Sequence, residues 1–466
     1  MHGLVSSLVC QPPTSAGMRF GGAVLILFAA CIPAAPTPSV PSVARAERVS
    51  VSPVRSIDLA DANFADLAPV GRAIGDARIV MLGEAGHGDG STFRAKARMV
   101  RFLHEKMGFD ILAWESGVWE CEQMNVAFAS SAAIADVARI GVYSLWANSE
   151  QVLPIFSYAR ESLATARPLQ MAGIDPKFST TARAAYRRWL LERLDATTLV
   201  KPEERADLER AFSRFPNVGK MQKLSREERE EDRAAFRRVL ERAEKSEDLL
   251  AGIVLTDRSL LRRSLRNVIA LYEWHEAVRA DISTTVQWDD HVSLNNVRDR
   301  TMAENLVWVA NERFPGAKVI VWAANMHVAR DMSTVDGTGT RFNPHLYDGF
   351  RPMGDLAEHW FPKAVYRLAF TSFDGETGLT GQPASTVDEV PRAGSVEASM
   401  QAFGYPQAFV DFRASTDERG GALRGRRPGA FLGHVLFEAD WARVFDGVFF
   451  IRTMSPSTPR AATAVK

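Results

Sequence analysis

The sequence predicts an α/β fold with a mostly parallel central sheet, flanking helices and a charged helical insert that forms a lid-like subdomain. Three observations support this fold class. Short apolar runs alternate with helical patterns, four of these runs end in polar side chains, and a long Glu- and Arg-rich stretch separates the third run from the fourth. Buried strands that alternate with helices are typical of a parallel sheet covered on both faces.

The bulk composition is that of a soluble globular protein. The chain has 466 residues, of which 46% are hydrophobic and 24% are charged. Lys and Arg together number 56, as do Asp and Glu. Because there is no basic surplus, nucleic acid is not expected as a partner.

The N-terminal segment has the pattern of an export signal. A basic residue, Arg19, precedes the apolar stretch 21–30, and Ala44–Ala46 reads as a small-x-small cleavage site. We expect residues 1–46 to be a leader and the mature chain to be periplasmic or secreted, without a stable membrane span. Lipid attachment at Cys31 is an alternative. Cleavage leaves Cys121 as the single cysteine, so we expect no internal disulfide and a buried thiol.

The predicted elements follow in order along the mature chain. Apolar runs predict strands at 77–82, 109–115, 168–175 and 317–325. Apolar residues at helical spacing predict helices at 91–107, 119–139 and 149–166, the first of them ended by Gly108.

The insert spans residues 181–312. Its middle carries Glu and Arg at spacings of three and four residues, which predicts a solvated helical hairpin. A plain exposed pair of helices and a lid over the strand ends are both compatible with this pattern.

Further strands are predicted at 364–373, 408–414 and 447–454, and the segments "DGETGLTGQPAS" and "RGGALRGRRPG" are predicted to be loops. The α/β domain is expected to cover 47–456, and a disordered tail 457–466.

Polar side chains follow all four of the first strands. Glu84 and His87 follow the first, Glu115 ends the second, Asp175 ends the third, and Asn325 and His327 follow the fourth. Ligands of parallel sheets bind beyond the carboxyl ends of the strands. These residues therefore predict a shared site.

The segment "GEAGHG" carries the clearest chemistry. A histidine titrates near neutral pH, and a neighbouring carboxylate fixes its tautomer and stabilises the imidazolium. We therefore expect His87 to be a general base oriented by Glu84.

Three more side chains are expected in the site. A buried acid at a strand end needs a partner, and Lys96 is predicted to pair with Glu115. Arg298 lies on a predicted helix of the insert, from which it is expected to bind an oxyanion or a carboxylate. His327 is expected to assist catalysis, while Asp175 and Asn325 are expected to bind substrate with Lys96 and Arg298.

Several standard motifs are absent from the sequence. It contains no Gly-x-Ser-x-Gly elbow, Walker loop, His-Glu-x-x-His or Cys-x-x-Cys. No cofactor is expected. Glu84, His87, Glu115 and His327 match no standard spacing of metal ligands, but a metal-assisted hydrolase stays an alternative.

The stretch "GEAGHGDGSTFRAKARMVRFLHEKMGFDILAWES" resembles the leading signature of the erythromycin esterase family, which reads Gly-Glu-x-x-His-Gly, a helix with Lys or Arg, then Gly-Phe and a strand ending in Glu. The pieces "AGID", "RDRTMAEN", "VWAANMHV", "RPMGDL" and "GVFFIRTMSPS" follow in the family's order. The resemblance runs from about residue 57 to 456.

The resemblance implies hydrolysis of a macrolide lactone by a directly activated water, with no covalent acyl-enzyme. It implies that His87 is the base, that Glu84 supports it, that Lys96 and Glu115 belong to the site, and that His327 binds substrate or assists proton transfer. One position departs from the family's fourth-strand motif, Trp-Ala-His-Asn-x-His, because Ala324 stands in place of the first histidine.

The sequence thus favours a hydrolase that cleaves a carboxylic ester or lactone, with a small molecule as its partner. A binding protein of the cell envelope that has lost its chemistry is the alternative from another functional class, and Ala324 is the feature that supports it.

Overall fold

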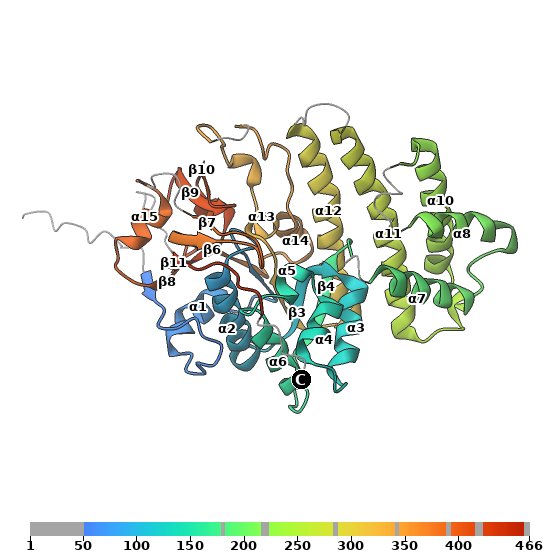
Figure 1. Ribbon diagram of the computed structural model, residues 1–466, viewed down its shortest axis with the longest axis horizontal. Helices are drawn as coiled ribbons and strands as arrows, with labels where there is room; N and C mark the ends of the chain where they lie inside the picture. Colours follow the sequence, from blue (N-terminus) through green and yellow to red (C-terminus); the bar gives the residue numbers. More distant parts are fainter. Residues whose placement is uncertain are drawn as a thin grey trace, which may run out of the picture. The chain divides into compact units, whose positions relative to one another are not determined.

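In the computed structural model (Figure 1), the described residues are 51–178, 182–215, 223–282, 288–340, 344–387, 393–414 and 423–460. The predicted leader, 1–46, and its cysteines lie outside these ranges. Cys121 is buried, with its thiol 3.4 Å from the carbonyl oxygen of Gly141, and burial raises its pKa well above the usual value.

Within the described ranges, the main sheet has the strand order β1-β8-β11-β6-β2-β5-β3-β4, with β7 paired to β6. The six strands from β11 to β4 are parallel to their neighbours, whereas β8 is antiparallel to β11 and to β1. Their bounds are β1 Val51–Pro53, β2 Ile79–Leu82, β3 Phe109–Gly117, β4 Gln170–Asp175, β5 Lys318–Trp322, β6 Val365–Thr377, β7 Ser385–Thr386, β8 Gln407–Asp411 and β11 Gly447–Met454. The predicted α/β class and parallel sheet are confirmed.

The strands are buried on both faces. All four residues of β2 are buried, and alternate side chains point to opposite sides. Ile79 and Met81 belong to one hydrophobic core, which also contains residues of the insert, while Val80 and Leu82 belong to the other. Strand β2 lies between β5 and β6, so its carboxyl end is at the middle of the sheet.

Helix α2 (Gly90–Met107) follows β2 and ends where Gly108 adopts a φ of +79°. A left-handed residue suits glycine, which explains why the helix stops there. The single helix predicted at 119–139 is wrong: α3 covers Val118–Phe128 and α4 covers Ile134–Gly141. Ser130 interrupts it, because its hydroxyl bonds the carbonyl of Ala127 and accepts from the amide of Ala132. Helix α6 (Leu153–Ser162) is shorter than the predicted 149–166.

The insert is helical, as predicted. It contains α7 (Arg183–Asp195), α8 (Arg205–Arg214), α10 (Arg226–Lys245), α11 (Leu255–Ile282) and α12 (Trp288–Trp308). Helix α10 begins with a capping box between Ser225 and Glu228. Figure 1 shows α7, α8 and α10 gathered beyond α11, with α12 next to the sheet. A lid function for this insert stays a prediction.

The remaining helices are α1 Ala68–Ile74, α5 Ser144–Ala147, α13 Asn325–Val328, α14 Met353–Trp360, α15 Val396–Gln401 and α16 Trp441–Val444. None of the helices in the described ranges is long and apolar enough to cross a membrane.

The ends of two predicted loops and part of the predicted tail belong to regular or packed structure. Strand β6 extends to Thr377, and a hairpin forms from β9 (Arg427–Leu432) and β10 (Val435–Ala439). Residues 457–460 pack against the loop that precedes α6: the Ser457 hydroxyl is 2.8 Å from that of Ser149, and the amide of Glu150 donates to the carbonyl of Thr458. Residues 461–466 lie outside the described ranges. The proline and small residues of this segment predicted a disordered tail. Its residues instead form hydrogen bonds with Ser149 and Glu150, which are 308 residues away in sequence.

Arg367 on β6 is fully buried, and its guanidinium binds the carboxylates of Asp446 and Glu358 and the carbonyl of Gly354. We expect Arg367→Met to lower the free energy of unfolding by up to about 3–5 kcal/mol, because buried Asp446 then keeps only Arg330 as a cationic partner and the carbonyl of Gly354 loses its donors. Urea denaturation measures the change. The control Arg139→Met removes an exposed pair with Asp136 and should cost at most about 1 kcal/mol. Equal effects of the two substitutions would contradict the prediction.

Candidate active site

The four polar strand ends lie at one edge of the sheet. Strands β2, β5, β3 and β4 are adjacent in that order and run parallel, so their carboxyl ends are side by side. This placement brings the side chains of Glu84, Glu115, Asp175 and His327 into one cluster, as the contacts below show.

Glu84 connects His87 to Lys96. Its Oε1 is 2.8 Å from Nδ1 of His87, and its Oε2 accepts a hydrogen bond of 2.6 Å from Nζ of Lys96. Glu84 and Lys96 are fully buried, whereas the side chain of His87 is 36% exposed. Among the described residues, no group lies within hydrogen-bond distance of Nε2 of His87. The carboxylate therefore accepts a hydrogen bond from Nδ1–H and leaves Nε2 as the free acceptor of a partly exposed ring.

Aromatic rings enclose this carboxylate. The indole N–H of Trp146 donates to Oε1 of Glu84 at 3.3 Å, and the ring meets His87 edge-on with centroids 5.5 Å apart. Nζ of Lys96 lies 4.3 Å from the centre of the Trp322 ring. Trp146 is a site residue that the sequence analysis missed, because nothing near it in sequence marks it.

The charges shift the pKa values of both basic groups. Burial by itself would lower the pKa of His87, but the hydrogen bond to Glu84 and the charges of Glu115 and Glu84 outweigh it, so the pKa is raised above 6.5. Burial lowers the pKa of Lys96 to about 8, although Glu84 opposes this effect.

Arg298 of α12 is the partner of two strand-end acids. Its Nη2 lies 2.6 Å from Oε1 of Glu115 and 2.5 Å from Oδ2 of Asp175. The predicted pairing of Lys96 with Glu115 is wrong: Lys96 binds Glu84, and Arg298 binds Glu115. The prediction chose a cation close to Glu115 in sequence, whereas the true partner, Arg298, lies on a helix 183 residues further along the chain.

His327 is held between two carboxylates. Its Nδ1 is 2.9 Å from both oxygens of Asp299, and its Nε2 is 3.3 Å from Oε1 of Glu115. Burial opposes protonation, yet Asp299 and Glu115 raise the pKa of His327 to about 9. Nε2 also lies 2.9 Å from a nitrogen of Arg298, a contact that cannot be a hydrogen bond when both groups are cationic. At neutral pH the acids on both sides therefore hold an imidazolium.

Asp299 was missed by the sequence analysis. It is fully buried, and its Oδ1 also accepts the amide of Met353 at 2.8 Å. The available signal was its position next to Arg298 in "RDRTMAEN", which places two charged residues on one turn of a helix.

Glu115 is ionised and fixed at both oxygens. Its Oε2 accepts the backbone amide of Ala324 at 2.9 Å, and its Oε1 faces Arg298 and His327. Burial would raise its pKa, but His327 and Arg298 hold it well below the usual value. The contact at Ala324 comes from the backbone, so it does not depend on the side chain at this position.

Three of the predicted substrate-binding residues are buried in this conformation, and their role in binding substrate stays a prediction. Lys96 and Asp175 are fully buried, and Asn325 is 1% exposed. The Asn325 amide donates to the carbonyls of Phe370 and Phe431, so it joins β6 to β9. Asp175 binds Arg298, and Lys96 binds Glu84. Only Arg298 of the four, with its side chain 12% exposed, retains some access.

Comparisons with known proteins identify the family of this chain. The model of the erythromycin esterase family matches residues 104–454, about three quarters of the chain. The chain belongs to the erythromycin esterase family. Membership in the erythromycin esterase family supports a hydrolase role with a small-molecule substrate.

Relatives cover most of the chain at low identity. YbfO from Bacillus subtilis, a provisionally named hydrolase, is 26% identical over 420 residues, which are 86% of this chain and 89% of that protein. The erythromycin esterase type II of Escherichia coli is 24% identical over 423 residues, covering 85% and 94%.

A solved structure of a mutant erythromycin esterase EreC in its open conformation matches with a TM-score of 0.66 at 19% identity, over 88% of this chain and 98% of that one. A Bacillus cereus protein matches with a TM-score of 0.72 at 16% identity, over 88% and 96%. At these identities the structural matches show the fold alone.

The carboxylates of the site are paired with its histidines: Glu84 contacts His87, and Glu115 and Asp299 contact His327. Within the described ranges, no three His, Cys, Asp or Glu side chains are arranged to hold a metal ion.

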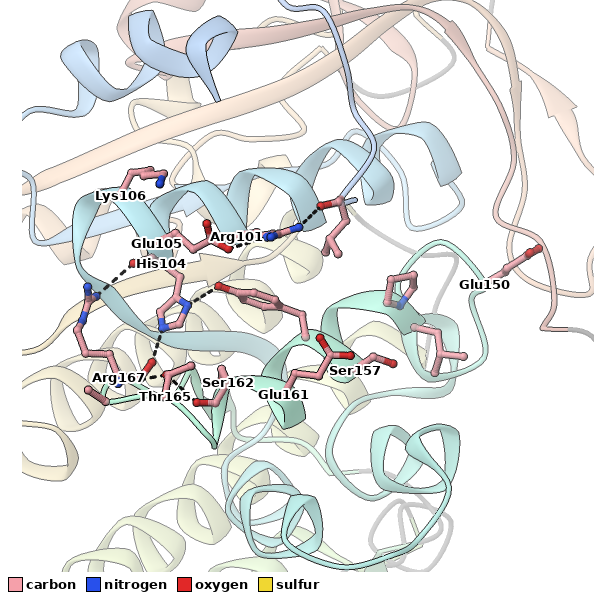
Figure 2. Close-up of a pocket in the computed structure, with 15 residues that line it drawn as sticks. Arg101, His104, Glu105, Lys106, Glu150, Ser157, Glu161, Ser162, Thr165 and Arg167 are labelled. Carbon is pink, nitrogen blue, oxygen red and sulfur yellow. Dashed lines mark hydrogen bonds and ion pairs between the residues drawn. The ribbon is translucent and has the colours of Figure 1, made fainter. Parts of the chain in front are cut away.

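A separate cavity of about 970 Å³ lies at the other end of α2 (Figure 2). His104 and Tyr158 line it, with Nδ1 of His104 2.6 Å from the phenolic oxygen, and Nε2 2.8 Å from the carbonyl oxygen of Arg167. None of the cluster residues described above lines this cavity. Because α2 starts at the site and runs 18 residues away from it, the cavity is not part of the site.

The contacts of His327 generate a prediction. We expect Asp299→Asn to lower the pKa of His327 from about 9 toward 6.5, because the amide removes the charge but still accepts the Met353 amide. Histidine NMR titration measures the pKa. The control Asp348→Asn changes an exposed aspartate that pairs with exposed His345. This control should leave the pKa of His327 unchanged. An unaltered pKa in Asp299→Asn would show that Asp299 is not what holds the proton.

Proposed function

We propose that this protein hydrolyses a carboxylic ester or lactone with a water molecule that His87 activates. The observation that supports this most directly is the state of His87: one ring nitrogen is fixed by a buried carboxylate at 2.8 Å, the other has no hydrogen-bond partner among the described residues, and the side chain is 36% exposed. A general base needs this combination of a fixed tautomer and an accessible lone pair.

The proposed reaction proceeds without a covalent intermediate on the protein. Nε2 of His87 takes a proton from water while the water oxygen attacks the carbonyl carbon. The imidazolium, stabilised by Glu84, then returns the proton to the leaving alkoxide as the carbon–oxygen bond breaks. The products are a carboxylic acid and an alcohol.

One cation near the base is suited to stabilise the developing oxyanion. The side chain of Arg298 is 12% exposed and is held in place by Glu115 and Asp175, so no reorganisation is needed when charge develops. His327 is only 2% exposed and is bound by Asp299 and Glu115, so in the proposed mechanism its positive charge holds Glu115 without touching the oxyanion. Lys96 was expected to share this role, but its ammonium is buried behind Glu84. In the proposed mechanism it keeps Glu84 ionised and in position.

Ala324 favours one competing function. The family's fourth-strand motif usually carries a histidine there, so this chain lacks one imidazole near Glu115. A protein that binds the ligand without turning it over would show saturable binding of erythromycin and no product. A metal-assisted hydrolase would lose activity to a chelator and regain it with a divalent metal ion.

We expect the protein to add one water to an ester substrate, and His87→Ala to reduce turnover by roughly 10²–10⁴-fold, the usual contribution of a general base. Mass spectrometry of erythromycin and of simple p-nitrophenyl esters measures the product. An exposed histidine serves as the control, and His345→Ala should keep full activity. If His87→Ala is as active as the unaltered protein, His87 is not the base.

The pH dependence follows from the two histidines and Lys96. The base must be neutral, so kcat/KM should rise with pH through the pKa of His87, which lies above 6.5. Lys96 and His327 must stay protonated to hold Glu84 and Glu115 in position, so kcat/KM should fall between about pH 8 and pH 9. The expected profile is therefore bell-shaped. A profile that keeps rising to pH 10.5 would remove His327 from the mechanism.

A further inference from the structure

The loop that carries His87 is held by segments from the C-terminal part of the chain. The backbone amide of Asn325 donates to the backbone carbonyl of Glu84, and the backbone amide of Gly433 donates to the carbonyl of Ala85. The carbonyl of Gly88 accepts from the amides of Gly378 and Ser457. The loop is thus fixed from several sides, and the β9–β10 hairpin supplies one of them.

Asp89 is the side chain at the centre of these contacts. It is fully buried, and its Oδ2 accepts the amide of Gly86 at 2.9 Å. Its Oδ1 lies 2.8 Å from Nε2 of His434 and 2.6 Å from the hydroxyl of Thr377. The Gly86 amide is one residue from His87, so this carboxylate sets the path of the backbone at the base.

The backbone and the side chain of His434 both fix its contact with Asp89. It lies at the tip of the β9–β10 hairpin with a φ of +59°, a left-handed conformation that is uncommon outside glycine. Its side chain is 7% exposed, and its Nδ1 is buried without a partner among the described residues. The Asp89 carboxylate only accepts hydrogen bonds, so Nε2 must carry the proton that it receives.

We propose that His434 and Asp89 are a positioning pair for His87: His434 holds the Asp89 carboxylate, and Asp89 holds the turn that presents His87 to Glu84. The inference rests on the proposed function in that His87 is taken to be the base. Neither His434 nor Asp89 touches the reacting atoms. The sequence analysis found no pattern around His434, which lies 345 residues from its partner.

The length of the His87–Glu84 contact makes the proposal testable. The hydrogen bond to Glu84 raises the pKa of His87, so a turn that loses its support should let this contact loosen and the pKa fall. A purely electrostatic effect of losing the donor would act in the other direction, because the Asp89 carboxylate would then lack one of its hydrogen bonds and a nearby negative charge raises the pKa of a histidine.

The experiment compares His434→Ala, His434→Phe and His434→Gln in the full chain. Alanine and phenylalanine remove the donor, and phenylalanine keeps the volume of the ring. Glutamine keeps an N–H donor at a similar reach. We expect the first two variants to lower kcat by about 10–100-fold, as found for groups that orient metal-binding histidines, with little change in KM. We also expect a lower pKa of His87 in histidine NMR titrations. His434→Gln should remain close to the unaltered protein in both.

Thermal unfolding shows which variants are folded, and His345→Ala is the matched histidine control. If His434→Ala does not fold, His434→Phe carries the test. The proposal is overturned if a folded donor-less variant keeps the kcat and the His87 pKa of the unaltered protein, or if His434→Gln is as impaired as His434→Phe. Should the unaltered protein hydrolyse no ester, the proposed function fails, while the NMR titration still decides the positioning role.

Discussion

Charge balance in a buried cluster is the constraint on which the site depends. Four carboxylates, Glu84, Glu115, Asp175 and Asp299, lie at the carboxyl edge of the sheet with exposures of 2% or less. Burying an unpaired carboxylate is costly, so each needs a cation or several hydrogen-bond donors. Lys96, Arg298 and protonated His327 supply three positive charges. His87 is the fourth basic group and the most accessible of them.

This balance explains why His87 suits the role of a base. Burial opposes the protonated form of His87, but the hydrogen bond to Glu84 and the charges of Glu115 and Glu84 favour it, so the pKa of His87 is raised. Taking a proton from water therefore places a positive charge next to these two carboxylates. Arg298 and His327 are held too firmly by their partners to take part in proton transfer at neutral pH, whereas burial lowers the pKa of Lys96 to about 8.

The sequence allowed the strands and the site edge to be predicted, because both depend on local patterns. Apolar runs predicted β2 to β5, and the polar residues after them predicted the cluster. The spacing of Glu84 and His87 on a glycine-rich loop predicted their contact. These inferences needed only neighbours in sequence and the rule that parallel strands end at one edge.

The pairing of charges could not be predicted in the same way. Lys96 and Arg298 each had a choice of carboxylates, and tertiary packing decided that Lys96 binds Glu84. Asp299, Trp146 and His434 reach the site from helices and a hairpin whose placement no local pattern specifies. Asn325 follows β5 and begins α13, but its side chain points into the protein, where it satisfies two carbonyl groups.

The strand order has a consequence for how the chain is made. Strand β2 is flanked by β5 and β6, which begin at Lys318 and Val365, so more than 230 residues are synthesised before β2 meets either neighbour. At about 5–20 residues per second, this wait is on the order of 10–50 s. Throughout it, a fully apolar strand has both edges unpaired and is prone to aggregate. Strand β2 therefore stays unpaired for longer than a strand whose neighbours follow it directly in the sequence.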